Sequence, residues 1–267
     1  MTREYSIFAW NVNIYNNRIH TWLLAYMAAH TPDIVVLSET KATEPILDTY
    51  LDQYPGYNYI VNAHSPANFH GVAMLVKADI AAVTRPVILN IPPRRDTKSD
   101  DPANGRVICC EIDNKFLVVG TYVPNSGVIP DPIKFDYRIN IWDPAFSTYL
   151  NTCAASLPTL LVGDINVAQT DLDVSNPKTM IRYAGSRPAE RASFSQFLQT
   201  GWVDVWRRDH PQEKGYTWIS YNVRAGHGMR LDNIVASNSL AARVSSTVIG
   251  PFITVSDHIP ISCKVRI

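Results

Sequence analysis

Residues 160–178 read LLVGDINVAQTDLDVSNPK, and the point at which this stretch turns from apolar to polar decides how the chain folds. Leu160, Leu161 and Val162 are typical of a buried strand. The run ends at Asp164 and Asn166, although burying a carboxylate is costly unless it is paired. Either residue by itself is most often a turn or cap residue. The pattern gains weight only if other strands end in the same way.

Other predicted strand ends carry polar residues of the same kinds. They are Asn11, Glu39, Tyr122, Asn125, Asp232, Asp257 and His258. A lone histidine before a strand is more often structural than catalytic. If one edge of a sandwich gathers these groups, however, it holds hard oxygen ligands for Mg²⁺ and an acid–base pair. The chain has no Cys/His zinc set, no P-loop and no serine nucleophile elbow, so chemistry on phosphate fits best.

The remaining periodicities predict an α/β fold. Apolar residues recur at helical spacing over 19–27, 46–54 and 142–150, the last with a restart at Pro144, and a further helix is expected near 190–200. Short apolar strands lie between and after these helices, and residues 91–105 are expected to form an exposed loop. We therefore predict a four-layered α/β sandwich, two packed, mainly antiparallel β-sheets flanked by helices, as a single domain over 1–267.

The charge balance limits how the chain can bind a polyanion. There are 24 basic and 24 acidic residues, so the formal net charge is zero and nucleic-acid binding would need a locally basic face. Five arginines near the predicted site are candidates for it, unless they are ordinary surface residues. They are Arg182, Arg187, Arg191, Arg224 and Arg230.

Cysteine usage and hydropathy bear on location. Cys109, Cys110, Cys153 and Cys263 form no C-x-x-C pair and are expected to be buried, reduced thiols. The first residues enter a strand without the pattern of a signal peptide, and no window approaches 18 apolar residues. We expect a cytoplasmic protein with no membrane partner, nucleoid-associated in a bacterium or nuclear in a eukaryote.

Eight motifs, in order from residue 10 to residue 260, resemble the exonuclease III/AP endonuclease branch of the endonuclease–exonuclease–phosphatase superfamily. They are WNVN, LSETK, GVAMLVK, YVPNSG, GDINVAQTDLDVSNPK, YTWISY, GMRLDNIVAS and SDHIPI. GDxN and SDH occur throughout the superfamily, which includes deoxyribonuclease I, sphingomyelinases and inositol phosphatases. YVPN and LDVSNPK are much more specific to the DNA-repair branch.

The resemblance implies an enzyme that hydrolyses the DNA backbone 5′ to abasic sites and leaves a 3′-hydroxyl. It also implies 3′→5′ exonuclease and 3′-phosphatase activity in unknown proportion, a requirement for Mg²⁺ with Mn²⁺ as substitute, and action as a monomer. The expected partner is double-stranded DNA with abasic sites or blocked 3′ ends.

The roles that the resemblance carries over fall into three groups. In the first, Glu39 resembles the principal Mg²⁺ ligand, and the residues near the metal are Asn11, Asp257, Asp164 and Asn166. In the second, Asp164 resembles the base that activates water, with Asn166 as its partner, and His258 resembles the phosphate contact held by Asp232. Tyr122 and Asn125 resemble residues on the phosphate side. Independently of the resemblance, amide donors such as Asn166 are expected to help keep the pKa of Asp164 low.

The third group concerns DNA and the damage pocket. Asn176 resembles a contact to the DNA backbone. Trp218, Met229 and Leu231 resemble the lining of an abasic pocket, although Trp218 also fits a core position in a strand. Two positions depart from the family pattern, with Ile14 in place of Gly and Ser38 in place of Gln. Two alternatives stay open: another superfamily phosphoesterase, such as a retroelement-type endonuclease or a phosphatase, and a DNA-binding homologue without catalysis.

Overall fold

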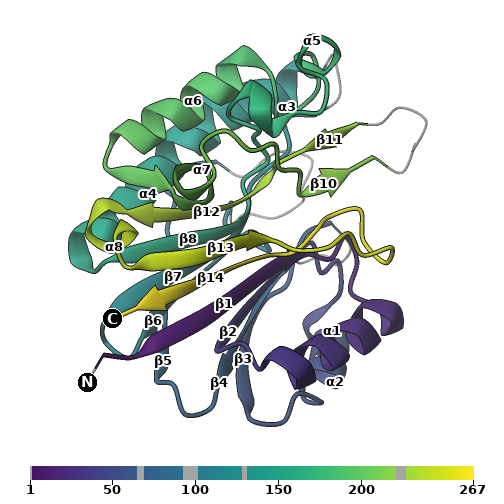
Figure 1. Ribbon diagram of the computed structural model, residues 1–267, viewed down its shortest axis with the longest axis vertical. Coiled ribbons are helices and arrows are strands. Elements are labelled where there is room, and N and C mark those ends of the chain that lie inside the picture. Colours follow the sequence, from purple (N-terminus) through teal and green to yellow (C-terminus); the bar gives the residue numbers. More distant parts are fainter. Residues whose placement is uncertain (1, 65–68, 93–101, 128–130, 221–226) are drawn as a thin grey trace.

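Two β-sheets packed face to face, with helices on their outer sides, make up the computed structural model of the protein (Figure 1). It describes residues 2–64, 69–92, 102–127, 131–220 and 227–267. In these ranges the first sheet has six strands, in the order β13 (Val244–Ile249), β14 (Ile261–Arg266), β1 (Glu4–Asn11), β2 (Ile34–Ser38), β4 (Val72–Lys77) and β3 (Tyr57–Asn62). The second also has six, in the order β5 (Ala82–Arg85), β6 (Val107–Ile112), β7 (Phe116–Tyr122), β8 (Thr159–Asp164), β12 (Asp232–Ser237) and β9 (Trp202–Asp204).

Strand direction explains why polar residues gather at one edge. β1 and β2 are parallel and so are β7 and β8, whereas the neighbouring strands pair antiparallel. Asn11 is opposite Ser38 at the end of the first parallel pair. Asp164 is opposite both Tyr122 and Asp232 in the second sheet. The carboxyl ends of two parallel pairs and the start of β12 therefore carry the predicted polar residues.

Alternation along the strands builds the core. Ile7 and Ala9 of β1 face a cluster between the sheets, which also contains Val118 of β7 and Val162 of β8. Their sequence neighbours point outward, as the two-residue period of a strand requires. Phe8 of β1, for example, packs under the first helical layer.

Helices cover the outer face of each sheet, and capping residues mark the two ends of α1. The first sheet is covered by α1 (Asn17–His30) and α2 (Glu44–Leu51), and α1 buries Ile19, Leu23 and Met27 as its periodicity predicted. Asn16 is the N-cap of α1. Thr31 is its C-cap and adopts a φ of 43°, one residue before Pro32. The other helical elements are α3 (Pro132–Asp136), α4 (Asp143–Ser156), α5 (Pro177–Met180), α6 (Pro188–Gln199), α7 (Val205–Asp209) and α8 (Asn238–Ala241).

The helical layer on the second sheet has an unusual start. The π-helical segment η1 (Tyr137–Trp142) runs directly into α4, so the expected restart lies at Asp143, with Pro144 in the first turn of the new helix. Trp142, Phe146 and Leu150 pack on the outer face of β6, β7 and β8. The arrangement confirms the predicted four-layered sandwich with mainly antiparallel sheets.

The cysteines, the 91–105 loop and a short hairpin complete the description of the fold. The four cysteines are free and buried, as predicted. Most of the expected 91–105 loop lies outside the described residues. A short hairpin, β10 (Trp218–Ile219) and β11 (Gly228–Met229), and the 3-10 turn η2 (Asp171–Asp173) complete the fold. The hairpin lies at the end of the molecule away from the two chain termini (Figure 1). No helix in the described ranges is both long and apolar enough to span a membrane.

Candidate active site

A cavity of about 250 Å³ opens at the polar edge of the two sheets. Ten of the residues singled out from the sequence line it, namely Glu39, Tyr122, Asn125, Asp164, Asn166, Trp218, Met229, Leu231, Asp257 and His258. Asn11 and Asp232 lie directly behind them in hydrogen-bond contact. A larger cavity of about 480 Å³ lies between α4, α6 and the second sheet, and its lining is mainly apolar. The polar chemistry belongs to the smaller cavity.

Asp164 is held by three amide groups at the centre of the site. Its Oδ1 accepts from the backbone N–H of Asn166 at 2.8 Å, and its Oδ2 accepts from Asn11 Nδ2 at 2.9 Å. Asn166 Nδ2 lies 3.4 Å from the same Oδ2 and donates to the Val123 carbonyl at 2.8 Å. Asn11 Nδ2 also donates to Glu39 Oε1 at 3.1 Å, so one carboxamide joins two carboxylates.

His258 and Asp232 form a buried pair on the other side of Asp164. His258 Nδ1 and Asp232 Oδ2 are 2.7 Å apart. Burial by itself would lower the pKa of His258, but the Asp232 carboxylate outweighs it and raises the pKa to about 10. The imidazole is therefore positively charged at neutral pH, with Nε2 free to face the cavity. The short contact between the two side chains fits this charge state.

The pKa of Asp164 depends on more than its amide donors. Burial raises the pKa of Asp164, and the nearby Asp232 and Glu39 carboxylates add to the effect, to about 8. The amide donor of Asn166 acts in the opposite direction but is too weak to keep the pKa low. Asn166 therefore acts in the predicted direction, but burial and the crowding of carboxylates, which the sequence does not show, outweigh it.

A hydrogen-bonded chain that the sequence reasoning missed links Glu39 to the cavity wall. Lys41 Nζ is 2.6 Å from Glu39 Oε2 and donates to Asn13 Oδ1 at 2.8 Å. Asn13 Nδ2 donates to Asp257 Oδ1 at 3.0 Å, and Trp218 Nε1 donates to Asp257 Oδ2 at 3.0 Å. Burial would raise the pKa of Glu39, but the Lys41 ammonium and His258 hold it below its usual range. Lys41 and Asn13 stand inside the motifs LSETK and WNVN, which is the signal that pointed to them.

Backbone strain marks the same residues. Asn13, Glu39, Lys41 and Asn166 have φ values of 58°, 53°, 48° and 54°. Such left-handed conformations cost about 1–3 kcal/mol each in non-glycine residues and tend to cluster at functional sites. The chain turns sharply at these positions, and Asn13, Glu39 and Asn166 line the cavity.

The far wall of the cavity is apolar. Met229 and Leu231 are buried in a small cluster with Ala168, Val174 and Met180, and Trp218 packs against it while staying half-buried. Trp218 pairs with Met229 in the β10–β11 hairpin and forms a β-bridge with His258. This placement favours the pocket-wall interpretation of Trp218 over the core interpretation.

Some of the proposed DNA contacts are placed differently. Asn176 lies outside the cavity, exposed, and its Oδ1 caps α5 by accepting from Thr179 N at 3.4 Å. Arg230 was expected on a basic face, and this was wrong, because its side chain is 1% exposed and bound to Asp173 and Asp204 at 2.6 Å each. A buried guanidinium between two carboxylates cannot reach DNA.

The other arginines of the supposed basic face differ among themselves. Arg187 donates to the Gly127 carbonyl at 2.7 Å, and Arg191 pairs with Asp171 at 2.7 Å. Arg182 is exposed beside Tyr183, which lines the cavity. Arg224 lies outside the described residues.

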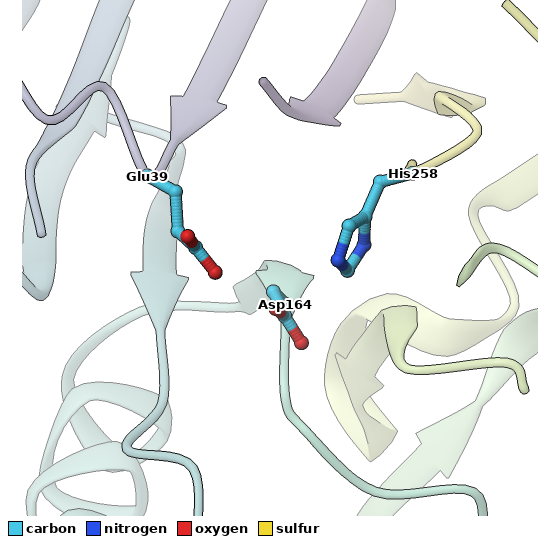
Figure 2. Close-up of side chains that lie close together, drawn as sticks. All are labelled: Glu39, Asp164 and His258. Carbon is cyan, nitrogen blue, oxygen red and sulfur yellow. The ribbon is translucent and has the colours of Figure 1, made fainter. Parts of the chain in front are cut away.

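The donor set fits a divalent cation. Ligand atoms of Glu39, Asp164 and His258 lie within 4.8 Å of one another, and the three side chains point toward a common centre (Figure 2). Because His258 is protonated and bound to Asp232, the carboxylates of Glu39 and Asp164 are the better ligands. Hard oxygen donors suit Mg²⁺. The raised pKa of Asp164 reflects its burial beside the Asp232 and Glu39 carboxylates, and a bound cation would offset this crowding of negative charge.

Comparison with known proteins shows to which family the chain belongs. The family model described as Endonuclease/Exonuclease/phosphatase family matches residues 8–258. The chain belongs to this family. A DNA-(apurinic or apyrimidinic site) endonuclease of Dictyostelium discoideum is 36% identical to it over 98% of this chain and 71% of its own length. An exodeoxyribonuclease of Bacillus subtilis (strain 168) is 31% identical over 98% of this chain and 99% of its own length.

Two solved structures of the family share the fold. An AP endonuclease from Leishmania major has a TM-score of 0.82 at 26% identity and covers 99% of this chain and 88% of its own. A 3′ phosphatase from Neisseria, bound to a product DNA hairpin, has a TM-score of 0.83 at 26% identity and covers 98% and 99%. The predicted exonuclease III/AP endonuclease branch is confirmed, and so is the prediction of a nuclease-type hydrolase that acts on phosphodiesters.

Proposed function

We propose that the protein hydrolyses the backbone of duplex DNA on the 5′ side of an abasic site and leaves a 3′-hydroxyl. The proposal rests on one observation: polar and apolar groups line the same cavity. A carboxylate and an imidazolium stand on one side of it, and the apolar wall of Trp218, Met229 and Leu231 stands on the other. The same centre would serve 3′→5′ exonuclease and 3′-phosphatase reactions, because a 3′-terminal phosphate presents the same reacting group.

The chain's own residues account for the acid–base part of the reaction. Asp164, fixed by Asn11 and Asn166, orients a water molecule and takes its proton. The His258 imidazolium donates a hydrogen bond to a non-bridging phosphate oxygen, and Asp232 keeps it charged. Burial and the nearby Glu39 and Asp164 carboxylates hold the pKa of Tyr122 well above its usual range, so its hydroxyl stays a neutral donor beside the Asn125 carboxamide.

The proposal includes Mg²⁺, with Mn²⁺ as substitute, held by Glu39 and Asp164. Asn11 and Asn166 hydrogen-bond to these carboxylates and would orient them, whereas Asp257 is joined to Glu39 only through Asn13 and Lys41. When bound, the cation supplies charge neutralisation at the phosphate oxygens and the leaving oxygen. It would also favour the ionised form of Asp164, whose pKa lies near 8 without it.

The apolar wall supports selection of damaged DNA. A nucleotide that lacks its base costs less to pull out of the stack, because pairing and stacking are already lost. The exposed sugar then meets Trp218, Met229 and Leu231, while a complete nucleotide would have to fit a base into a cavity of about 250 Å³. Asn176, exposed at the start of α5, would contact the backbone of the bound duplex.

The proposal also covers the domain organisation and the oligomeric state. The cavity is lined by residues between 13 and 258 of one chain, and both sheets contribute to one core. We therefore propose a single domain over 1–267 that works as a monomer. Its place in the cell would be that of its DNA substrate, the nucleoid or the nucleus.

The test is a side-by-side assay of duplexes with an internal abasic analogue, a recessed 3′ end or a 3′-phosphate, each with Mg²⁺ and with EDTA. We expect incision 5′ to the abasic site that EDTA abolishes. Asp164→Asn keeps the shape but cannot take a proton, and should lower the single-turnover rate by about 10²–10⁴ while DNA binding is kept. Activity on inositol phosphates in a parallel assay, without cleavage of any duplex, would instead identify another phosphoesterase of the superfamily. DNA binding without cleavage would identify an inactive homologue.

A further inference from the structure

Arg138 is a buried cation directly behind the two loops that carry the cavity's carboxamides. Its side chain is 2% exposed. Nη1 donates to the Pro124 carbonyl at 2.8 Å and Nη2 to the Ile165 carbonyl at 2.9 Å. Nε donates to Asp143 Oδ1 at 2.6 Å, and Asp143 Oδ2 accepts from Ser193 of α6 at 2.8 Å. The guanidinium thus joins the loop after β7, the loop after β8 and the outer helices.

The two carbonyls belong to peptide groups that lead into the site. A trans peptide is planar, so its N–H points away from its C=O. The carbonyl of Ile165 and the N–H of Asn166 are one such group, and that N–H donates to Asp164 Oδ1 at 2.8 Å. A single rigid peptide therefore separates Arg138 from the proposed base. The carbonyl of Pro124 and the N–H of Asn125 form the second group.

We propose that Arg138 is a positioning residue for the reaction. By holding the carbonyls of Pro124 and Ile165, it aims the peptide groups that lead into Asn125 and Asn166 and keeps the second one on Asp164. Asn166 has a φ of 54°, a conformation that persists only where surrounding contacts enforce it. The inference rests on the proposed function for the role of Asp164.

Two further contacts tie the two loops to each other. Asn166 Nδ2 donates to the Val123 carbonyl at 2.8 Å, and the N–H of Val123 donates to the Asp164 carbonyl at 2.8 Å. Releasing the carbonyl of Ile165 would loosen both. An arginine suits this position because its planar fork offers donors in fixed directions, whereas a lysine ammonium is a single point.

The π-helical segment explains how Arg138 and Asp143 meet. In an α-helix, residues five apart point about 140° away from each other. The wider turn of a π-helix brings them to nearly the same face, and the backbone N–H of Asp143 indeed bonds to the carbonyl of Arg138. π-helical turns of this kind are frequent at functional sites. Asp143 can therefore orient the guanidinium of Arg138 through Nε, while Nη1 and Nη2 of the same guanidinium reach the loops.

The test is Arg138→Lys, assayed on the abasic duplex under single-turnover conditions and for DNA affinity. We expect the rate constant to fall about 10²-fold, as for a displaced reacting group, with Kd for DNA unchanged. The matched control is Arg208→Lys. Arg208 also binds a carboxylate and two carbonyls, with Nε on Asp209 at 2.7 Å and Nη1 and Nη2 on Ala241 and Val244 at 2.6 and 2.9 Å, but it lies on α7. This control should lose stability and keep its rate.

A rate for Arg138→Lys equal to that of the wild type, or a loss confined to Kd, would overturn the inference. If the variant does not fold, Asp143→Asn takes its place, because it leaves Arg138 and both carbonyl contacts present but removes the ionic partner. We expect about a tenfold lower rate, in the range typical of second-layer partners, and an unchanged rate would again overturn the inference. A wild-type protein inactive on every DNA substrate would instead reject the proposed function itself.

Discussion

At the scale of single residues, the site is governed by where charges are buried and which partners they have. Asp164 and His258 are both buried, yet their pKa values move for different reasons. Burial and neighbouring carboxylates raise the pKa of Asp164 to about 8, whereas Asp232 raises that of His258 to about 10 in spite of burial. At neutral pH this pair combines a carboxyl group close to its titration point with a fixed positive charge.

Replacing Asp232 by Asn should move the pH–rate profile toward acid. Loss of the carboxylate lowers the pKa of His258, because burial then acts without a partner, so the imidazolium and the activity are lost at lower pH. The pKa of Asp164 falls as well, since Asp232 is the main charge that raises it. Single-turnover rates between pH 5 and 10 measure both limbs. An alkaline limb that stays in place would contradict the pairing, and Asp209→Asn, on α7, serves as control.

At the scale of elements, strand ends and one short hairpin build the cavity. Parallel pairing of β7 with β8 puts Tyr122 opposite Asp164, and antiparallel pairing brings Asp232 to the same level. The β10–β11 hairpin then closes the apolar side, with Trp218 bridged to His258 and Met229 bridged to Val174. The hairpin therefore joins the apolar wall of the cavity to His258, the proposed phosphate contact.

Trp218→Ala should reduce selectivity more than stability. A core tryptophan changed to alanine typically costs about 3–5 kcal/mol, but Trp218 is half-buried and its removal should cost less. Its loss also frees Asp257 from the indole N–H and widens the cavity for an intact nucleotide. We expect a lower ratio of kcat/KM for abasic over undamaged duplex, with a small change in Tm. A large drop in Tm with unchanged selectivity would place Trp218 in the core. Trp142→Ala, in the core beneath α4, is the reference for that outcome.

At the scale of the whole molecule, charge neutrality restricts how DNA is held. The formal net charge is zero, and Arg187, Arg191 and Arg230 are engaged within the protein. Among the described residues, Arg182, next to Tyr183 of the cavity lining, and Lys178, in α5, are exposed cations. Binding should therefore depend on a few phosphate contacts close to the site and not on a broad basic surface.

The salt dependence of DNA affinity tests this picture. If two to four phosphates are neutralised, a tenfold rise in salt should lower the association constant by about 10²–10⁴. Arg182→Gln and Lys178→Gln should each reduce the slope by about one. Arg266→Gln should leave it unchanged, because Arg266 pairs with Glu4 at the opposite end of the first sheet. A slope insensitive to Arg182 and Lys178 would place the DNA elsewhere.

The sequence by itself determined the layers of the fold and most of the site. Two-residue and helical periodicities are local signals, and they predicted β8, α1 and the break before α4 because each depends on a few neighbouring residues. The polar strand ends identified the residues that the sheets bring together, since parallel pairing puts carboxyl ends at one edge. The motifs identified the family because the chemistry needs those residue types and the fold brings these strand ends together in that chain order.

Only the tertiary structure decided how these residues behave. Asn11 and Asp164, 153 positions apart, share a hydrogen bond, and no local pattern encodes that distance. The burial of Arg230, the raised pKa of Asp164 and the link from Glu39 through Lys41 to Asp257 follow from which segments pack together. Desolvation and charge pairing depend on the surroundings in three dimensions, and for that reason Arg138 shows its contacts with the active-site loops only in the folded protein.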